Sequence, residues 1–133
     1  MDIRDEIDQL KKEKDAVILA HYYVRPEVQE IADYTGDSFY LSRTAEKLTS
    51  KVLVFAGVSF MGESAKLLNP EKVVLMPDLS ADCAMAHMAD AGTIRKMRDT
   101  YEDLAVVCYI NSTAELKGHS DVCVTSANAV KIV

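Results

Sequence analysis

The chain has 133 residues, of which 49% are hydrophobic, 27% are charged and 7% are aromatic. These proportions indicate an ordinary globular protein with a real core, and they exclude a disordered, collagen-like or disulfide-stapled chain. No apolar run reaches the roughly 18 residues that a membrane helix needs, and residues 2–14 are too polar for a signal peptide. We therefore expect a cytoplasmic protein without a membrane partner.

The charge balance and the cysteines narrow the function classes further. Fifteen Lys and Arg stand against 21 Asp and Glu, which gives a formal net charge of -6. Such a field repels polyanions, and no local basic patch offsets it, so a nucleic-acid partner is not expected. The three cysteines form no Cys-x-x-Cys motif. They favour reduced thiols, or a metal site assembled from distant positions, over disulfides.

Short apolar runs alternate with amphipathic stretches along the first part of the chain. Residues 5–14 predict a helix, because Ile7 and Leu10 lie at helical spacing among charged residues. The uninterrupted run over residues 16–20 is typical of a strand buried on both faces of a parallel sheet. Two further runs of this kind cover residues 52–56 and 73–76.

Helices are expected between these runs. Pro26 starts one helix, and Gly36 ends it. Asp37 and Ser38 cap the next, over residues 39–48, and a third helix leads from the second strand to the third. The alternation then begins again, with a helix near residues 93–98, a strand over 104–110, a short helix over 114–117, a strand over 121–125 and a helix from residue 127.

This alternation predicts an α/β fold, a parallel sheet with flanking helices. When the two halves of the sequence are aligned, residues 16–18 match residues 105–107. Glu27 and Glu115 then fall at nearly the same offset, with one residue of slippage. The pattern indicates a weak internal repeat, with chance similarity as the open alternative. One complete unit would cover residues 1–87 and about half of a second unit residues 88–133, so we expect the chain to be an incomplete portion.

Polar side chains gather where the expected strands end. Ligands of open parallel sheets bind outside the carboxyl ends of the strands, where helix N-termini suit carboxylate or phosphate groups. The implied ligand is small, polar and acidic. The candidate binding residues at these ends are His21, Tyr23, Ser38, Tyr109, Asn111 and Ser126.

Each candidate has a plain structural alternative. His21 is either a satisfied loop histidine or a contact to a carboxylate or carbonyl, with Tyr23 as a hydroxyl able to transfer a proton. Ser38 can cap a helix and touch a ligand at once. Tyr109 and Asn111 alternate at the end of a buried strand, which strand termination alone also explains.

The cysteines differ in setting. Cys108 and Cys123 lie inside expected strands, where cysteine behaves as a small buried hydrophobe. Cys83 follows the third strand in a loop and is placed like a metal ligand. One thiolate cannot hold an iron-sulfur cluster, so Cys83 is open to both interpretations. A local metal site of all three cysteines is disfavoured, because two of them are committed to packing.

Six sequence blocks follow one another in order from Ala16 onward. Together they closely resemble the quinolinate synthase family of bacterial NAD biosynthesis, and six blocks in series are far more specific than any one. The blocks are His21-Tyr22-Tyr23, Gly36-Asp37-Ser38, Gly57-Val58-Ser59-Phe60-Met61, Pro77-Asp78 to Cys83-Ala84-Met85-Ala86, Tyr109-Ile110-Asn111-Ser112-Thr113-Ala114-Glu115 and Cys123-Val124-Thr125-Ser126-Ala127-Asn128-Ala129-Val130-Lys131.

The resemblance implies a transferase that condenses iminoaspartate with dihydroxyacetone phosphate to give quinolinate, phosphate and water. It also implies three α/β units about a pseudo-threefold axis, each giving one cysteine to a [4Fe-4S] cluster that keeps one open iron site. By motif, Cys83 matches the cluster ligand of the first unit. Tyr23 matches a tyrosine with an acid/base role beside His21, and the positions that match substrate-binding residues are His21, Ser38, Tyr109, Asn111 and Ser126.

The chain departs from the family pattern in length. Family members continue through a second and third unit that carry two further cluster cysteines, so the rest of the enzyme is an expected partner of this chain. Alone, the 133 residues are expected to hold no intact cluster and to be inactive. The alternative is a non-catalytic α/β module for ligand binding or subunit interaction.

Overall fold

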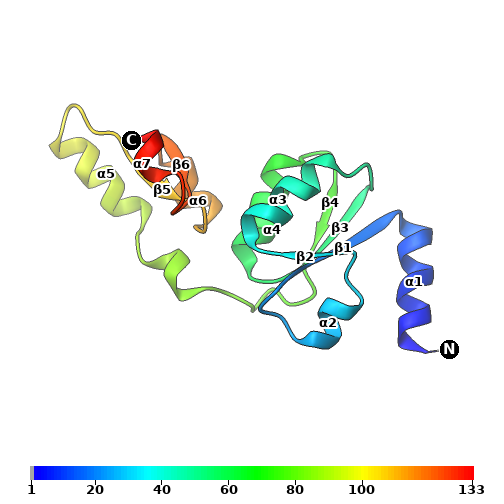
Figure 1. The fold of residues 1–133 in the computed structure, drawn as a ribbon. Coiled ribbons are helices and arrows are strands. Elements are labelled where there is room, and N and C mark those ends of the chain that lie inside the picture. The colour runs from blue at the N-terminus through cyan, green and yellow to red at the C-terminus, as the bar shows by residue number, and fades with distance from the viewer. Residues whose placement is uncertain (1) are drawn as a thin grey trace. The chain divides into compact units, whose positions relative to one another are not determined.

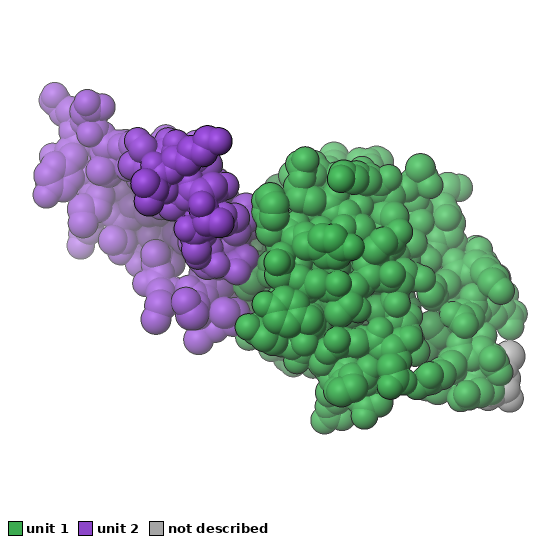
Figure 2. All heavy atoms as spheres, in the orientation of Figure 1, with its two compact units in different colours: residues 1–82 green, residues 83–133 purple. Residues whose placement is uncertain are grey.

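The computed structural model describes residues 2–133 and divides into two compact units. Unit 1 ends at Asp82 and unit 2 begins at Cys83, as Figure 2 shows in two colours. Each unit combines helices with a parallel sheet, so the expected α/β class is confirmed. No helix within residues 2–133 is long and apolar enough to cross a membrane. The repeat boundary expected after residue 87 stays a prediction.

Unit 1 is built on a four-stranded parallel sheet with the order β2-β1-β3-β4. The two central strands are the apolar runs, and their side chains Leu19, Leu53 and Phe55 are fully buried. Burial of such side chains is the main source of stability for a sheet of this kind. The strands are β1 (Ala16–His21), β2 (Tyr34–Gly36), β3 (Val52–Ala56) and β4 (Val73–Leu75).

Four helices accompany this sheet. Figure 1 shows α3 and α4 side by side against one face of the sheet, with α2 on the opposite side. The helix α1 is capped by the following residue, Asp15, whose left-handed backbone (φ 51°) lets its N–H bond to carbonyls of the last turn. The helices are α1 (Ile3–Lys14), α2 (Pro26–Glu30), α3 (Ser38–Lys47) and α4 (Ser59–Leu68).

The segment between Pro26 and Gly36 differs from the expectation. The helix α2 ends at Glu30, and the last three residues of the segment form the strand β2, so Gly36 ends a strand and not a helix. A strand of three residues with an exposed threonine at its centre carries too little apolar pattern to be seen in the sequence. As a result, β2 brings Gly36 into register with His21 at the end of β1.

A buried lysine closes the carboxyl end of α3. Lys72 is 8% exposed, and its Nζ donates to the carbonyl oxygens of Ala45 (2.8 Å) and Leu48 (2.6 Å) and to Oδ1 of Asn69 (2.9 Å). The ammonium thereby satisfies carbonyls at the end of a helix, where the dipole also favours a cation. It joins α3 to the turn between α4 and β4.

Unit 2 contains a two-stranded parallel sheet in which Cys108 and Cys123 are direct partners. The expected strands over residues 104–110 and 121–125 are each reduced to three residues. The elements are a short 3-10 helix η1 (Ala84–His87), α5 (Ala91–Thr100), β5 (Val107–Tyr109), α6 (Ala114–Gly118), β6 (Val122–Val124) and α7 (Ala129–Ile132).

The internal repeat is present, with a shift of 88 residues that holds without slippage. The pairing of Leu19 with Tyr34 in unit 1 becomes the pairing of Val107 with Val122 in unit 2. The expected alignment of residues 16–18 with residues 105–107 was therefore wrong by one residue. Under this shift, β2 (Tyr34–Gly36) falls on β6 (Val122–Val124) and α2 (Pro26–Glu30) falls on α6 (Ala114–Gly118).

Candidate functional site

The strand order places the candidate residues of unit 1 at a switch point of the sheet. After β1 the chain passes to β2 on one side and then to β3 on the other, so the order reverses at β1. In open parallel sheets ligands bind outside the carboxyl ends of the strands at such a point. His21 is the last residue of β1, Asp37 follows β2, and Gly57 follows β3.

The imidazole of His21 is held as a neutral donor. Its Nδ1 accepts the backbone N–H of Tyr23 at 3.1 Å, which assigns the proton of the neutral ring to Nε2. The turn after β1 is fixed by Gln29 of α2, whose Nε2 donates to the carbonyl oxygens of Tyr22 (3.0 Å) and Val24 (2.8 Å). His21 therefore offers one N–H donor from a defined backbone position.

The turn after β3 brings Gly57 close to His21. A Cβ built at Gly57 would lie 2.7 Å from Sδ of Met61 and 3.5 Å from Cβ of His21. The first contact would push the flexible end of the methionine aside, and the second is an ordinary van der Waals distance. The backbone after β3 therefore lies against the end of β1 that carries His21.

His21 is expected to titrate below its ordinary value. Partial burial lowers the pKa of His21 from 6.5, and the carboxylate of Asp37 opposes this effect more weakly. The unfolded chain then binds more protons, so the stability from neutral His21 is full above pH 6.5 and falls as the pH drops below it. An NMR titration of the ring protons checks this, and a midpoint at or above 6.5 would contradict it.

Two tyrosines extend the histidine into a cluster of three rings. The His21 ring stacks on Tyr22 with centroids 4.6 Å apart and lies 4.7 Å from the ring of Tyr23. The neighbouring Tyr23 hydroxyl raises the pKa of Tyr22. Tyr23 is 82% exposed, which leaves its hydroxyl open to a ligand and to water. The arrangement puts a donor and a protic hydroxyl two residues apart.

Ser38 opens the helix α3 beside this cluster. The preceding residue Asp37 is the N-cap, and its Oδ1 accepts the backbone N–H of Tyr40 at 2.7 Å. Ser38 is half-buried in the first turn, where the helix dipole favours an anion. The cap that the sequence suggested is thus made by Asp37, and the hydroxyl of Ser38 is not the capping group.

Unit 2 presents three candidates in the equivalent positions. Tyr109 ends β5, and the Nδ2 of Asn111 donates to its hydroxyl at 3.4 Å. Ser126 is exposed after β6. The 88-residue shift relates His21 to Tyr109, Tyr23 to Asn111 and Ser38 to Ser126.

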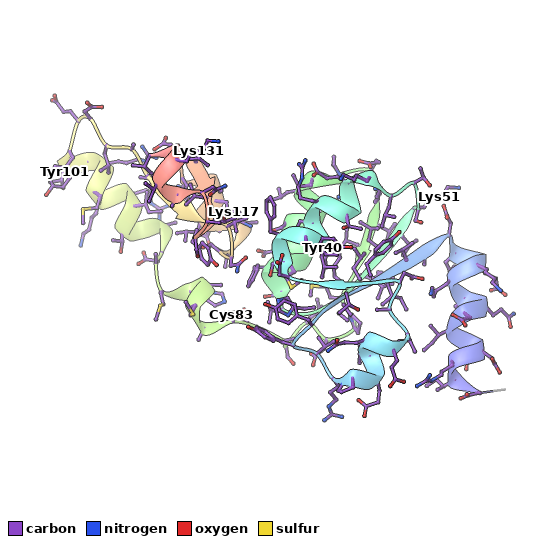
Figure 3. The ribbon with its side chains drawn as sticks, in the orientation of Figure 1. Tyr40, Lys51, Cys83, Tyr101, Lys117 and Lys131 are labelled. Atoms are coloured by element: carbon purple, nitrogen blue, oxygen red, sulfur yellow. The ribbon has the colours of Figure 1, made fainter. Side chains whose placement is uncertain are left out.

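The segment before Cys83 is anchored to the start of α4. The N–H of Ser59 donates to the carbonyl oxygen of Ala81 at 2.9 Å, and its hydroxyl donates to Oδ1 of Asp82 at 3.1 Å. Cys83 follows in extended conformation (φ -121°, ψ 117°) as the N-cap of η1 and is half-buried (Figure 3). The cysteine thus stands on a defined backbone outside both sheets.

The other two cysteines face each other across β5 and β6. Cys108 is buried, and its Sγ donates to the carbonyl oxygen of Tyr109 at 3.3 Å. Burial and then Cys108 raise the pKa of the Cys123 thiol, while Lys117 lowers it more weakly. None of the three cysteines is in a disulfide. Within residues 2–133, no group of three or more His, Cys, Asp or Glu side chains is placed to hold a metal ion.

Comparison with known proteins identifies the family. The model of the quinolinate synthetase A protein family matches residues 5–133. The chain belongs to this family. Relatives named quinolinate synthase include the proteins of Fusobacterium nucleatum (66% identical over 98% of the chain), Pyrococcus abyssi (57% over 100%) and Clostridium perfringens (56% over 100%).

The match covers less than half of these quinolinate synthases. The chain spans 44% of the length of each of the three relatives. Within unit 1 the fold brings His21, Tyr23 and Ser38 to one end of the sheet. Within unit 2 it brings Tyr109, Asn111 and Ser126 to the corresponding end of β5 and β6.

Three residues that surround the candidate site were not predicted as part of it. Asp37 caps the helix that begins with Ser38, Gly57 lies close to His21, and Gln29 holds the turn after β1. Asp37 was visible as a capping residue. The roles of the other two depend on contacts between elements, which no local pattern reports.

Proposed function

We propose that the chain is part of a quinolinate synthase that condenses iminoaspartate with dihydroxyacetone phosphate to give quinolinate, phosphate and water. The observation that carries this proposal is the neutral Nε2–H donor of His21 beside the first turn of α3, at the switch point of the sheet. Family membership and relatives named quinolinate synthase support it.

In this proposal unit 1 binds one acidic group of the substrate. His21 donates a hydrogen bond from Nε2, and Ser38 adds a hydroxyl where the dipole of α3 favours negative charge. A neutral imidazole suits this task because it needs no second proton to donate. The acidic chain carries no general attraction for anions, so these local donors provide the binding.

In the same proposal, the hydroxyl of Tyr23 transfers a proton to or from the substrate. Its hydroxyl is exposed two residues after His21, and the ring is held against the histidine ring. A positioned tyrosine can move a proton to or from a reacting group. The family resemblance assigns substrate binding to Tyr109, Asn111 and Ser126 of unit 2 as well, where a hydroxyl and an amide lie 3.4 Å apart.

Cys83 fits a cluster ligand as one thiolate of three. It is half-buried on a defined backbone, whereas Cys108 is buried within β5. One thiolate does not hold a [4Fe-4S] cluster, so the remaining ligands come from polypeptide outside residues 1–133. When bound, a cluster with an open iron supplies a Lewis acid that eases the loss of water.

The setting of the enzyme follows from the same residues. Three cysteines outside any disulfide are what a reducing compartment maintains, which supports a cytoplasmic location. The partner of these 133 residues is the rest of the enzyme, with the second and third units about a pseudo-threefold axis. The 88-residue repeat supports such a plan.

Anaerobic purification of the complete enzyme and of residues 1–133 tests the proposal. The complete enzyme is expected to carry iron and sulfide and to form quinolinate, detected by mass spectrometry, from the two substrates. The 133 residues alone are expected to hold no intact cluster and to form no product. A complete enzyme that lacks product under these conditions would favour a non-catalytic module, and an active isolated chain with stoichiometric iron would overturn the division of ligands.

A further inference from the structure

Asp33 joins β1 to β2 by two hydrogen bonds to a single residue. Its Oδ2 accepts the backbone N–H of Ile18 at 2.8 Å, and its own N–H donates to the carbonyl oxygen of Ile18 at 2.9 Å. The carboxylate thus continues the ladder of β1 and β2 by one step beyond Tyr34, the first residue of β2. Lys11 of α1 holds the other carboxylate oxygen at 2.7 Å.

Asp121 makes the same pair of bonds in unit 2. Its Oδ2 accepts the backbone N–H of Val106 at 2.7 Å, and its N–H donates to the carbonyl oxygen of Val106 at 2.9 Å. Arg98 of α5 lies on the same carboxylate at 2.9 Å. The bond from Val106, followed by that from Arg98, lowers the pKa of Asp121, so the carboxylate is charged at neutral pH.

The two aspartates are equivalent under the 88-residue shift, which also relates Ile18 to Val106. In both units the basic partner comes from the helix before the first strand of the pair. It is Lys11 of α1 in unit 1 and Arg98 of α5 in unit 2. Two occurrences of one scheme, with different neighbouring side chains, indicate that the carboxylate has a task in each unit. A surface ion pair alone contributes little to stability, so that task lies in the backbone bonds.

The bonded amides lie in or directly before strands that carry the candidate site, because Ile18 is in β1 and Val106 precedes β5. Ile18 lies three residues before His21, and Asp33 lies five residues before Ser38. The register between the two strands therefore decides where these side chains stand relative to each other. Since a slip of one residue turns every side chain to the other face of a sheet, this register has to be fixed.

We propose that Asp33 and Asp121 are positioning residues of the site. Each fixes the register of two strands, and so places His21 with Ser38 in unit 1 and Tyr109 with Ser126 in unit 2. This inference rests on the proposed function for the meaning of the site, while the register itself is measurable without any reaction. The geometry of the carboxylate, and not its charge, is the property that counts.

Two conservative variants separate geometry from charge. Asp33→Asn keeps an oxygen at the place that accepts the Ile18 N–H and loses the charge that attracts Lys11. Asp33→Glu keeps the charge and moves the oxygens by one methylene. Asp8→Ala is the matched control, because Asp8 is an exposed carboxylate that also approaches Lys11, at 3.8 Å.

Amide exchange and NMR shifts of the 133-residue chain give the first readout. Asp33→Glu is expected to raise the exchange rate of the Ile18 amide about tenfold, since the hydrogen bond from this amide is lost, and to move the ring signals of His21. Asp33→Asn and Asp8→Ala are expected to leave both near wild type. Asp121→Glu and Asp121→Asn repeat the comparison with Val106 and Tyr109. Equal effects of the Asn and Glu variants, or a rise in exchange spread over all of unit 1, would overturn the proposal.

The second readout is binding by the complete enzyme. Asp33→Glu is expected to weaken the affinity for quinolinate about tenfold at unchanged iron content. Asp33→Asn is expected to bind quinolinate as tightly as the wild-type enzyme. Affinity equal to wild type in Asp33→Glu would overturn the positioning role. If the wild-type enzyme neither binds nor forms quinolinate, the proposed function fails, and the exchange data still decide whether the aspartates fix the register.

Discussion

The complete enzyme with the substitution Cys83→Ser is expected to bind no [4Fe-4S] cluster. Cys83 is the one cysteine of this chain outside the paired strands β5 and β6, and in our proposal it is one of three thiolates that hold the iron. Loss of one ligand leaves two, which is fewer than a cluster needs, and a serine hydroxyl is a much weaker ligand for iron than a thiolate. Iron and sulfide per chain after anaerobic purification, together with the visible absorbance, measure the effect.

Cys108→Ser is the matched control for this prediction. The Cys108 thiol is 6% exposed and donates to a backbone carbonyl, a bond that a serine hydroxyl can also make. Full iron content is expected in this variant. The opposite pattern, with iron lost in Cys108→Ser and retained in Cys83→Ser, would exclude the assignment of Cys83.

In the wild-type chain the thiol of Cys123 is expected to react slowly with thiol reagents, because burial raises its pKa.

Lys72→Met is expected to lower the free energy of unfolding of unit 1 by about 3 kcal/mol, the cost of removing a buried charged donor from several acceptors. Methionine retains the apolar length of the side chain but leaves the oxygens of Ala45, Leu48 and Asn69 without their present donor. The carboxyl end of α3 should therefore loosen first. Urea denaturation of the 133-residue chain, followed through the NMR signals of Leu19 and Leu53 in the core, measures the change.

Lys51→Met is the control for the buried lysine. Lys51 is exposed just before β3 (Figure 3), so the same substitution there is expected to change the free energy of unfolding by less than about 0.5 kcal/mol. A similar loss in both variants would mean that the helix-end bonds of Lys72 contribute little. The comparison holds the chemical change constant and varies only the burial of the amine.

The sequence was sufficient for the parts of the fold that depend on local apolar pattern. The strands β1 and β3 lie where uninterrupted apolar runs predicted them, and α3 begins behind the expected cap at Asp37. The strand β2 was missed, because its three residues obtain their conformation from pairing with β1 and not from their own composition. The strand expected over residues 104–110 is shorter in the structure, because only Val107–Tyr109 pair with β6 as a strand.

The candidate site was predictable in its parts and not in its geometry. His21 and Tyr109 could be identified because they end apolar strands, and Ser38 because it follows a capping residue. The tautomer of His21 depends on a bond to the backbone of Tyr23, which only the turn geometry reveals. Asp33 and Asp121 look like ordinary turn residues in the sequence, since their proposed role arises from bonds to Ile18 and Val106, 15 residues earlier in the chain.

The shift of 88 residues also bears on how such a protein arose. A gene segment joined to a copy of itself starts with identical halves, and later substitutions accumulate where they are tolerated. Here serine stands at both Ser38 and Ser126, while histidine and tyrosine now occupy the matching positions His21 and Tyr109. Descent of both units from one segment would mean that an imidazole and a phenol diverged at corresponding places, so that two copies of one backbone scheme now offer chemically different groups.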